Sequence, residues 1–238
     1  NIDVNIVGDK LQSLEYEENF LTCITDEGLP NIDIIQHKPE NINRRIQVTN
    51  MSERINTLVD FNKYNLPKIQ LENKNLLINE TPIITIEQPM IYGNDKDITK
   101  IKNFATDIVN KIHNIVNIHN YTPEKFLIIF PIMKNNVLAD EIHTKLTEFW
   151  INKSRDKEFI SKLDDNNYWK NYIHDKYTQY VHLHKHQEGT VINTNDSINT
   201  TRIMSIRSSK GDGREVVLIL NCSESALKIV SKNEKNLL

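Results

Sequence analysis

Cysteine is scarce in this sequence, and long apolar segments are absent from it. Cys23 and Cys222 are the two cysteines among 238 residues. Two cysteines so far apart in the sequence exclude a disulfide-rich scaffold. We expect both to be reduced core thiols. No apolar run approaches the roughly 20 residues that cross a membrane, and no signal peptide is recognisable. We therefore expect no membrane partner and a cytoplasmic or nuclear location, or a viral replication site if the protein is viral.

An excess of positive charge is also missing. The formal net charge is -3, with 38% hydrophobic and 26% charged residues. This composition is typical of a soluble globular protein, and it restricts any nucleic-acid contact to a local patch. The sequence begins at Asn1 without a methionine and ends on Leu237 and Leu238, so we expect a fragment of a longer protein.

The most informative stretch runs from Thr201 to Asn221. A β-prone run at 203–206 enters a polar turn, and an apolar run at 216–220 leaves it, which predicts two neighbouring buried strands. Gly211 and Gly213 permit a tight turn and close approach of a ligand. Hydroxyls and cations that suit a phosphate oxygen surround the turn: Ser205, Arg207, Ser208, Ser209 and Lys210. A solvated hairpin loop is the alternative interpretation, because glycine and serine are common turn residues.

Two further elements predict an α/β fold. Apolar residues recur at helical spacing over 97–119, at Ile98, Ile101, Ala105, Ile108, Ile112 and Ile115 or Val116. The apolar run Phe126–Phe130 fits the central strand of a parallel sheet. A helix follows from near Asn136, and the helix–strand alternation favours α/β.

Four segments resemble motifs, or the approach to a motif, of the UvrD/Rep-type superfamily 1 DNA helicases, in a variant of large DNA viruses. The run Ser-Ile-Arg-Ser-Ser-Lys-Gly-Asp-Gly-Arg-Glu-Val-Val-Leu, from Ser205, is similar to motif V. The run Val-Gly-Asp-Lys-Leu-Gln-Ser-Leu-Glu-Tyr, from Val7, is similar to motif III. Asn43-Arg44-Arg45 before a helical pattern resembles motif IV, and the last six residues resemble the approach to motif VI.

The resemblance implies a RecA-like fold of the P-loop NTPase type, a parallel sheet flanked by helices. Residues 1–40 would end a first RecA-like domain, and residues 41–238 would form most of a second, incomplete at its C-terminus. The whole protein would be an ATP-dependent DNA helicase or translocase, with ATP and Mg²⁺ bound mainly by the first domain. Single-stranded DNA is the implied partner, with replication or repair proteins as further partners.

The resemblance also implies roles for individual residues. Gln12 and Arg45 would serve the γ-phosphate as catalytic residues. The nucleotide-contacting positions would be Gly8, Asp9, Gln12, Arg44, Arg45, Gly211 and Gly213. The DNA-contacting positions would be Tyr16, Ser205, Arg207, Ser208 and Lys210. A packed tyrosine at Tyr16 and an ordinary surface arginine at Arg45 are the alternatives.

The phosphate-binding pattern Gly-x-x-x-x-Gly-Lys-Ser/Thr and the acidic metal-binding motif are absent from this sequence. We therefore expect this polypeptide by itself to be inactive as an ATPase. Two alternatives stay open for the whole protein: a catalytically inactive, helicase-like nucleic-acid-binding or scaffold protein, and a nuclease-fused or recombination-type helicase.

His182, His184 and His186 recur at period two, which would place them on one face of a strand. Three imidazoles can form a zinc site. No cysteine or carboxylate stands nearby at a recognisable spacing, so we favour a solvated or edge-strand face and expect no metal.

Overall fold

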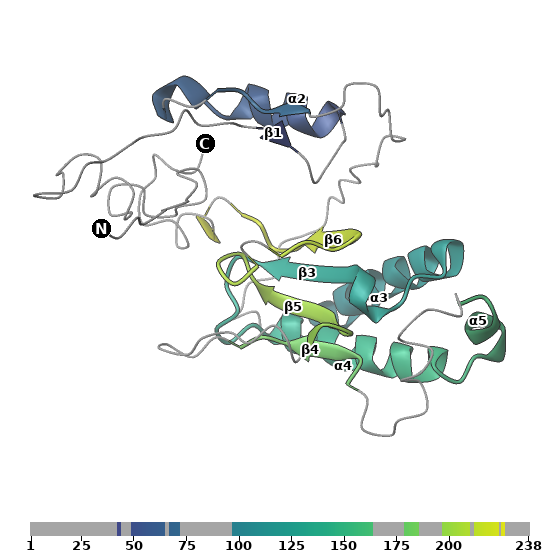
Figure 1. Ribbon diagram of the computed structural model, residues 1–238. Coiled ribbons are helices and arrows are strands. Elements are labelled where there is room, and N and C mark those ends of the chain that lie inside the picture. The colour runs from purple at the N-terminus through teal and green to yellow at the C-terminus, as the bar shows by residue number, and fades with distance from the viewer. Residues whose placement is uncertain are drawn as a thin grey trace, which may run out of the picture. The chain divides into compact units, whose positions relative to one another are not determined.

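The computed structural model describes residues 42–43, 49–64, 67–71, 97–163, 179–185, 197–209, 212–223 and 225–226 (Figure 1). The chain divides into two compact units, Asn1–Gln88 with Ser231–Leu238, and Pro89–Val230. The predicted domain boundary near residue 40 lies outside the described residues and stays a prediction.

The first unit contains a helix and a short parallel strand pair. β1 (Ile42–Asn43) pairs with β2 (Gln70–Leu71), and α2 (Thr49–Leu58) and the 3-10 helix η3 (Phe61–Tyr64) lie between them in sequence. The helix predicted after Arg45 is therefore confirmed. The Asn56 side chain of α2 donates to the carbonyl oxygen of Ile69 at 2.9 Å and accepts from the Ile69 N–H at 2.8 Å. One amide side chain thus satisfies the backbone just before β2.

The second unit contains an all-parallel sheet of four described strands. These are β3 (Phe126–Phe130), β4 (Val181–Leu183), β5 (Thr201–Ser205) and β6 (Val216–Ile219), in the spatial order β4-β5-β3-β6. The α/β prediction and the central position of β3 are confirmed. The prediction that β5 and β6 are neighbours is wrong, because β3 lies between them. A hairpin is excluded as well, since β5 and β6 are both parallel to β3.

Two helices cover one face of this sheet. α3 (Ile98–His119) begins after Asp97, whose carboxylate accepts from the Lys100 N–H, and ends at Asn120 in the left-handed conformation with φ 53°. α4 (Val137–Lys153) begins after Asn136, whose side chain accepts from the Ala139 N–H. The 3-10 helix η4 (Pro123–Lys125) precedes β3, and α5 (Lys157–Ser161) follows α4. Both long helices were predicted and are confirmed.

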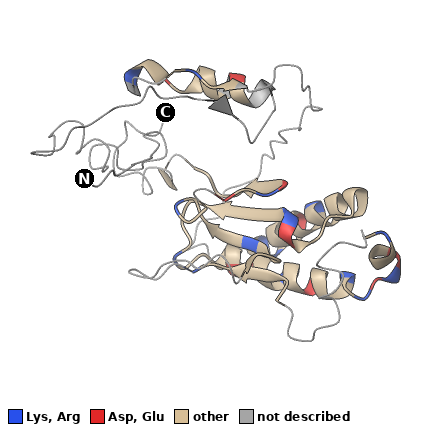
Figure 2. Cartoon of the chain, viewed as in Figure 1, with Lys and Arg blue, Asp and Glu red and all other residues tan. Residues whose placement is uncertain are grey.

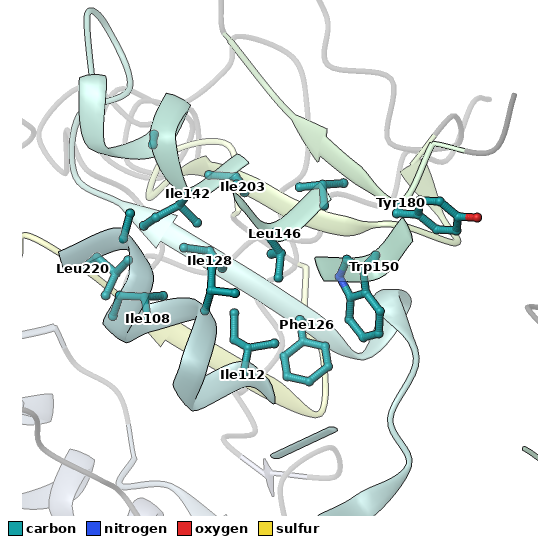
Figure 3. Close-up of a cluster of buried hydrophobic side chains, with 14 of the residues drawn as sticks. Ile108, Ile112, Phe126, Ile128, Ile142, Leu146, Trp150, Tyr180, Ile203 and Leu220 are labelled. Atoms are coloured by element: carbon teal, nitrogen blue, oxygen red, sulfur yellow. The ribbon is translucent and has the colours of Figure 1, made fainter. Parts of the chain in front are cut away.

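The main core lies between these helices and the sheet (Figure 3). Alternate residues of β3, Phe126, Ile128 and Phe130, face the helices and are fully buried. Their partners from the helices are Ile101, Ala105, Ile108, Ile112, Val116, Leu138, Ile142, Leu146 and Trp150. Ile98 was predicted on the same face, but it is 65% exposed at the first turn of α3.

The opposite face carries a second, smaller apolar cluster and a polar cluster. Leu127, Ile129 and Met204 are buried there and pack with Ile206. The segment 206–215, here called the crossover, joins β5 to β6, and the structure describes its residues 206–209 and 212–215. Its Asp212 pairs with Arg202, whose register partner is Leu127. Parallel strands usually need a connection of about a dozen residues or more, so this connection is short.

The described helices and Cys222 bear on the predictions about a membrane and the thiols. In the part of the chain that the structure describes, no helix is both long and apolar enough to span a bilayer. Cys222 is a free thiol, as expected, but it is exposed and not in the core. Cys23 lies outside the described residues.

Candidate nucleic-acid interface

The strands β3 and β5 are neighbours, and the connections that follow them lie on opposite faces of the sheet. After its carboxyl end β3 continues into α4 on the main-core face, whereas β5 continues into the crossover on the other face. In open parallel sheets, ligands bind outside the carboxyl ends of strands at such a switch of connectivity. The loops at this edge, here called the carboxyl edge, are residues 131–136, 184–185, 206–209 and 220–223 (Figure 1).

Two serine hydroxyls meet where β5 ends. Ser205 Oγ and Ser208 Oγ are 2.7 Å apart, and the Ser208 N–H donates to Ser205 Oγ at 3.1 Å. The Ser209 N–H donates to the Ser205 carbonyl oxygen at 2.9 Å. These bonds close a compact turn, which presents two hydroxyls at the carboxyl edge. Ser205, Arg207 and Ser208 lie in this one turn, and their contact with DNA stays a prediction.

Charge is distributed unequally between the two ends of the sheet. The described carboxyl-edge loops contain the cations Lys134, Lys185 and Arg207 and no carboxylate. Lys185 forms an ion pair with Asp140 in the first turn of α4, at 2.8 Å. Arg207 is exposed. The strands themselves are almost free of charge, apart from the blue segment on β5 (Figure 2), which is Arg202.

The opposite edge of the sheet carries charges of both signs. Glu124 and Lys125 lie in the described segment before β3, Arg214 and Glu215 lie before β6, and Lys125 pairs with Glu215. Arg214 donates to the carbonyl oxygens of Glu124 and Ile198, in the segments that precede β3 and β5. An anionic ligand is expected at the carboxyl edge because its described loops contain cations and no carboxylate.

Gly213 follows Asp212, whose N–H donates to the Ser209 carbonyl oxygen at 2.9 Å. The Gly213 N–H donates to Asp212 Oδ1 at 2.9 Å, and the next residue, Arg214, contacts the loop before β3. Ser205, Arg207 and Ser208 lie in the turn after β5, and Gly213 lies later in the crossover. A nucleotide contact of Gly213 stays a prediction.

Most other predicted site residues lie outside the described residues. They are Gly8, Asp9, Gln12, Tyr16, Arg44, Arg45, Lys210 and Gly211. Their assigned contacts with nucleotide or DNA stay predictions.

A buried polar cluster, missed by sequence reasoning, adjoins the crossover. Arg202 Nη1 donates to Asp212 Oδ2 at 2.6 Å, and Arg202 Nε donates to the Ser197 carbonyl at 3.2 Å and the Ser197 Oγ at 3.0 Å. His184 Nε2 lies 3.1 Å from the same Ser197 Oγ. The sequence signal was present: a single arginine within the otherwise uncharged strand 201–205 indicates a buried or paired guanidinium.

Burial controls the titration of His184. Desolvation, followed by the charges of His182 and Arg202, lowers the pKa of His184 from 6.5 to about 4, against an opposing effect of Asp212. The imidazole is therefore neutral near pH 7.

The predicted common face of the histidines is confirmed for His182 and His184, whose ring centroids lie 4.2 Å apart. β4 is an end strand of the described sheet, as expected. His184 is 6% exposed, so a solvated face is wrong for this residue. His186 lies outside the described residues, among which no group of three His, Cys, Asp or Glu side chains could hold a metal ion.

Comparisons of the chain with protein-family models, curated proteins and solved structures found no match.

Proposed function

We propose that this chain is part of an ATP-dependent DNA helicase or translocase of the UvrD/Rep type, and that the turn after β5 binds the phosphate backbone of single-stranded DNA. In this proposal the all-parallel sheet is a RecA-like domain. One observation carries the assignment: two hydroxyls and an exposed arginine stand together at the carboxyl edge, at the switch point between β3 and β5.

The chemistry of this turn suits a phosphate oxygen. One hydroxyl hydrogen bridges Ser205 and Ser208, so the other hydroxyl can donate to a ligand. The guanidinium of Arg207 supplies the charge and a planar set of donors. Contacts with phosphate and sugar position a nucleic acid without reading its sequence, which is what movement along a strand requires.

The ATP side of the proposal depends on residues beyond this turn. Gln12 and Arg45 would contact the γ-phosphate of ATP held, with Mg²⁺, mainly by the first domain of the whole protein. Arginine suits this role because its guanidinium stabilises charge on the transferred phosphoryl group. ATP hydrolysis would then be coupled to stepping along DNA.

Binding of single-stranded DNA tests the proposal directly. We expect the chain to bind a fluorescein-labelled oligothymidylate in a fluorescence anisotropy titration at low salt. Arg207→Ala should raise the Kd about tenfold, because a hydrogen bond to a charged group contributes about 1.5–3 kcal/mol. The double variant Ser205→Ala with Ser208→Ala should also weaken binding.

A matched control is Arg155→Ala, since Arg155 is an exposed arginine in the turn after α4. This variant should bind like the original chain. No binding at low salt, or equal loss of affinity in Arg155→Ala and Arg207→Ala, would disprove the proposed interface.

The catalytically inactive, helicase-like DNA-binding protein is a second candidate. It is favoured by Gly213, which stands where the family has the glutamate that bonds the nucleotide ribose and which has no side chain to replace it. ATPase activity of the whole protein distinguishes the two candidates.

A further inference from the structure

The Arg202–Asp212 ion pair is the most buried ion pair among the described residues. The side chains are 8% and 16% exposed, and Nη1 and Oδ2 are 2.6 Å apart. A second ion pair in the same region, Lys125–Glu215, is far more exposed, at 34% and 44%. Exposed pairs contribute little, whereas loss of one partner of a buried pair is strongly destabilising.

The guanidinium of Arg202 is held from two sides. Its Nε donates to the carbonyl and the hydroxyl of Ser197, ahead of β5, while Nη1 is directed to Asp212. Because Arg202 belongs to β5 and its register partner is Leu127 of β3, its backbone cannot shift without disrupting the sheet. Asp212 is therefore tied to a fixed point.

Backbone hydrogen bonds continue from Asp212 to the serine turn. The Asp212 N–H donates to the Ser209 carbonyl oxygen at 2.9 Å, and the Ser209 N–H donates to the Ser205 carbonyl oxygen at 2.9 Å. At the far end, the Ile206 N–H donates to the Phe130 carbonyl oxygen at 2.9 Å. The described part of the crossover is thus bonded to the sheet at both of its ends.

We propose that Arg202 and Asp212 are positioning residues, whose ion pair holds the crossover against the sheet so that Ser205, Arg207 and Ser208 are ordered before DNA binds. This inference rests on the proposed DNA contact of that turn. A loop that is already ordered does not lose conformational entropy on binding, so its affinity for the ligand is higher. The pair itself contacts no DNA.

The first experiment measures hydrogen exchange of the backbone amides at 206–209 in Asp212→Asn, which removes the charge and keeps the shape. We expect exchange at Ser208 and Ser209 to accelerate about tenfold or more, because local opening becomes easier. Amides of β3 should stay protected, which shows that the unit remains folded. Glu215→Gln, in the exposed pair of the same crossover, is the control and should leave 206–209 unchanged.

The second experiment measures binding of the labelled oligothymidylate. Asp212→Asn should raise the Kd about tenfold, within the range of coupling inside one hydrogen-bond network. In the Asp212→Asn variant, Arg207→Ala should raise the Kd by a smaller factor than in the original chain, because the arginine is no longer held in place. Asp212→Glu, which restores the charge, should recover part of both the affinity and the protection from exchange. A role in stability alone would lower the melting temperature without changing the cost of Arg207→Ala.

The two proposals fail in different ways. If the original chain does not bind the oligothymidylate, the proposed function is wrong. Unchanged exchange at 206–209 in Asp212→Asn, or fully additive effects of Asp212→Asn and Arg207→Ala on the Kd, would overturn the positioning role while leaving DNA binding intact. If Asp212→Asn does not fold, Ser197→Ala, which removes one acceptor of Arg202, should show the same changes in smaller size. Its failure to do so would also overturn the positioning role.

Discussion

Trp150 donates its indole N–H to the hydroxyl of Thr201 at 3.1 Å. The Thr201 hydroxyl in turn donates to the carbonyl oxygen of Pro123 at 2.9 Å. Trp150 and Thr201 are completely buried. One hydroxyl therefore joins the last turns of α4, the start of β5 and the segment before β3, inside the core shown in Figure 3.

Replacement of this hydroxyl should destabilise the fold. Thr201→Val keeps the shape of the side chain but leaves the indole N–H without its acceptor. We expect the free energy of unfolding, measured by urea denaturation, to fall by about 1–3 kcal/mol. Thr144→Val, at an exposed position of α4, should change it by less than about 0.5 kcal/mol. Equal effects of the two variants would contradict the importance of the buried hydroxyl.

The stability of the first unit should depend on the Asn56 side chain. Asn56→Ala removes both hydrogen bonds to the Ile69 backbone, so the Ile69 amide should exchange with solvent faster, as measured by hydrogen exchange. The free energy of opening at Ile69 should fall by about 1–2 kcal/mol, since two partly buried backbone groups lose their partner. Thr57→Ala, at the next position, removes an exposed hydroxyl and should leave exchange at Ile69 unchanged.

The proposed DNA contact predicts a specific salt dependence. For single strands, the logarithm of the binding constant falls with the logarithm of salt concentration by about 0.7 per phosphate neutralised. Anisotropy titrations at several salt concentrations should give a slope that is smaller by about 0.7 for Arg207→Ala, and an unchanged slope for Arg155→Ala. An identical slope in Arg207→Ala would show that this guanidinium does not neutralise a phosphate.

The folded state should lose stability in mild acid because of His184. Its pKa of about 4 in the folded state lies below the ordinary value of about 6.5, so between these pH values the unfolded chain binds more protons. The free energy of unfolding should therefore decrease as the pH falls from 6.5 to 4, by about 2–3 kcal/mol from this residue. The neighbouring groups His182, Arg202 and Asp212 are unchanged in the test variant.

That test variant is His184→Gln, which cannot be protonated. Its unfolding free energy, measured by urea denaturation at each pH, should vary less between pH 6.5 and pH 4 than that of the original chain. His119→Gln, at an exposed position, should retain the full pH dependence because His184 is present. The same pH profile in all three proteins would show that His184 does not cause the loss of stability between pH 6.5 and pH 4.

The absence of a P-loop predicts that this polypeptide shows no DNA-stimulated ATPase activity. Phosphate release should be the same with and without oligothymidylate. Any background activity that persists unchanged in Arg207→Ala comes from a contaminant. A DNA-stimulated activity that Arg207→Ala abolishes would show that the expectation is wrong.

Local patterns in the sequence were sufficient for the elements with a strong periodicity. α3 and α4 follow from apolar residues at helical spacing with Asp97 and Asn136 as capping residues. The unbroken apolar run of β3 correctly predicts a strand buried on both faces.

Strand order could not be obtained in this way. The apolar runs at 203–206 and 216–220 are close in sequence, and local reasoning made them neighbours. β5 and β6 instead pair with opposite edges of β3. The short polar segment between them in sequence contains no signal for this strand order. Burial of Arg202 and His184 is equally non-local, because it depends on Asp212 and Ser197 folding back over β5.

The neighbours of β3 on both edges come from much later in the chain, since Leu127 pairs with Arg202 on one side and with Val217 on the other. During synthesis the most apolar strand therefore leaves the ribosome long before either edge can be paired. Such an unpaired apolar strand is prone to association with other chains. We expect the yield of folded protein to depend on chaperones, and truncation before residue 216 to leave one edge of β3 permanently open.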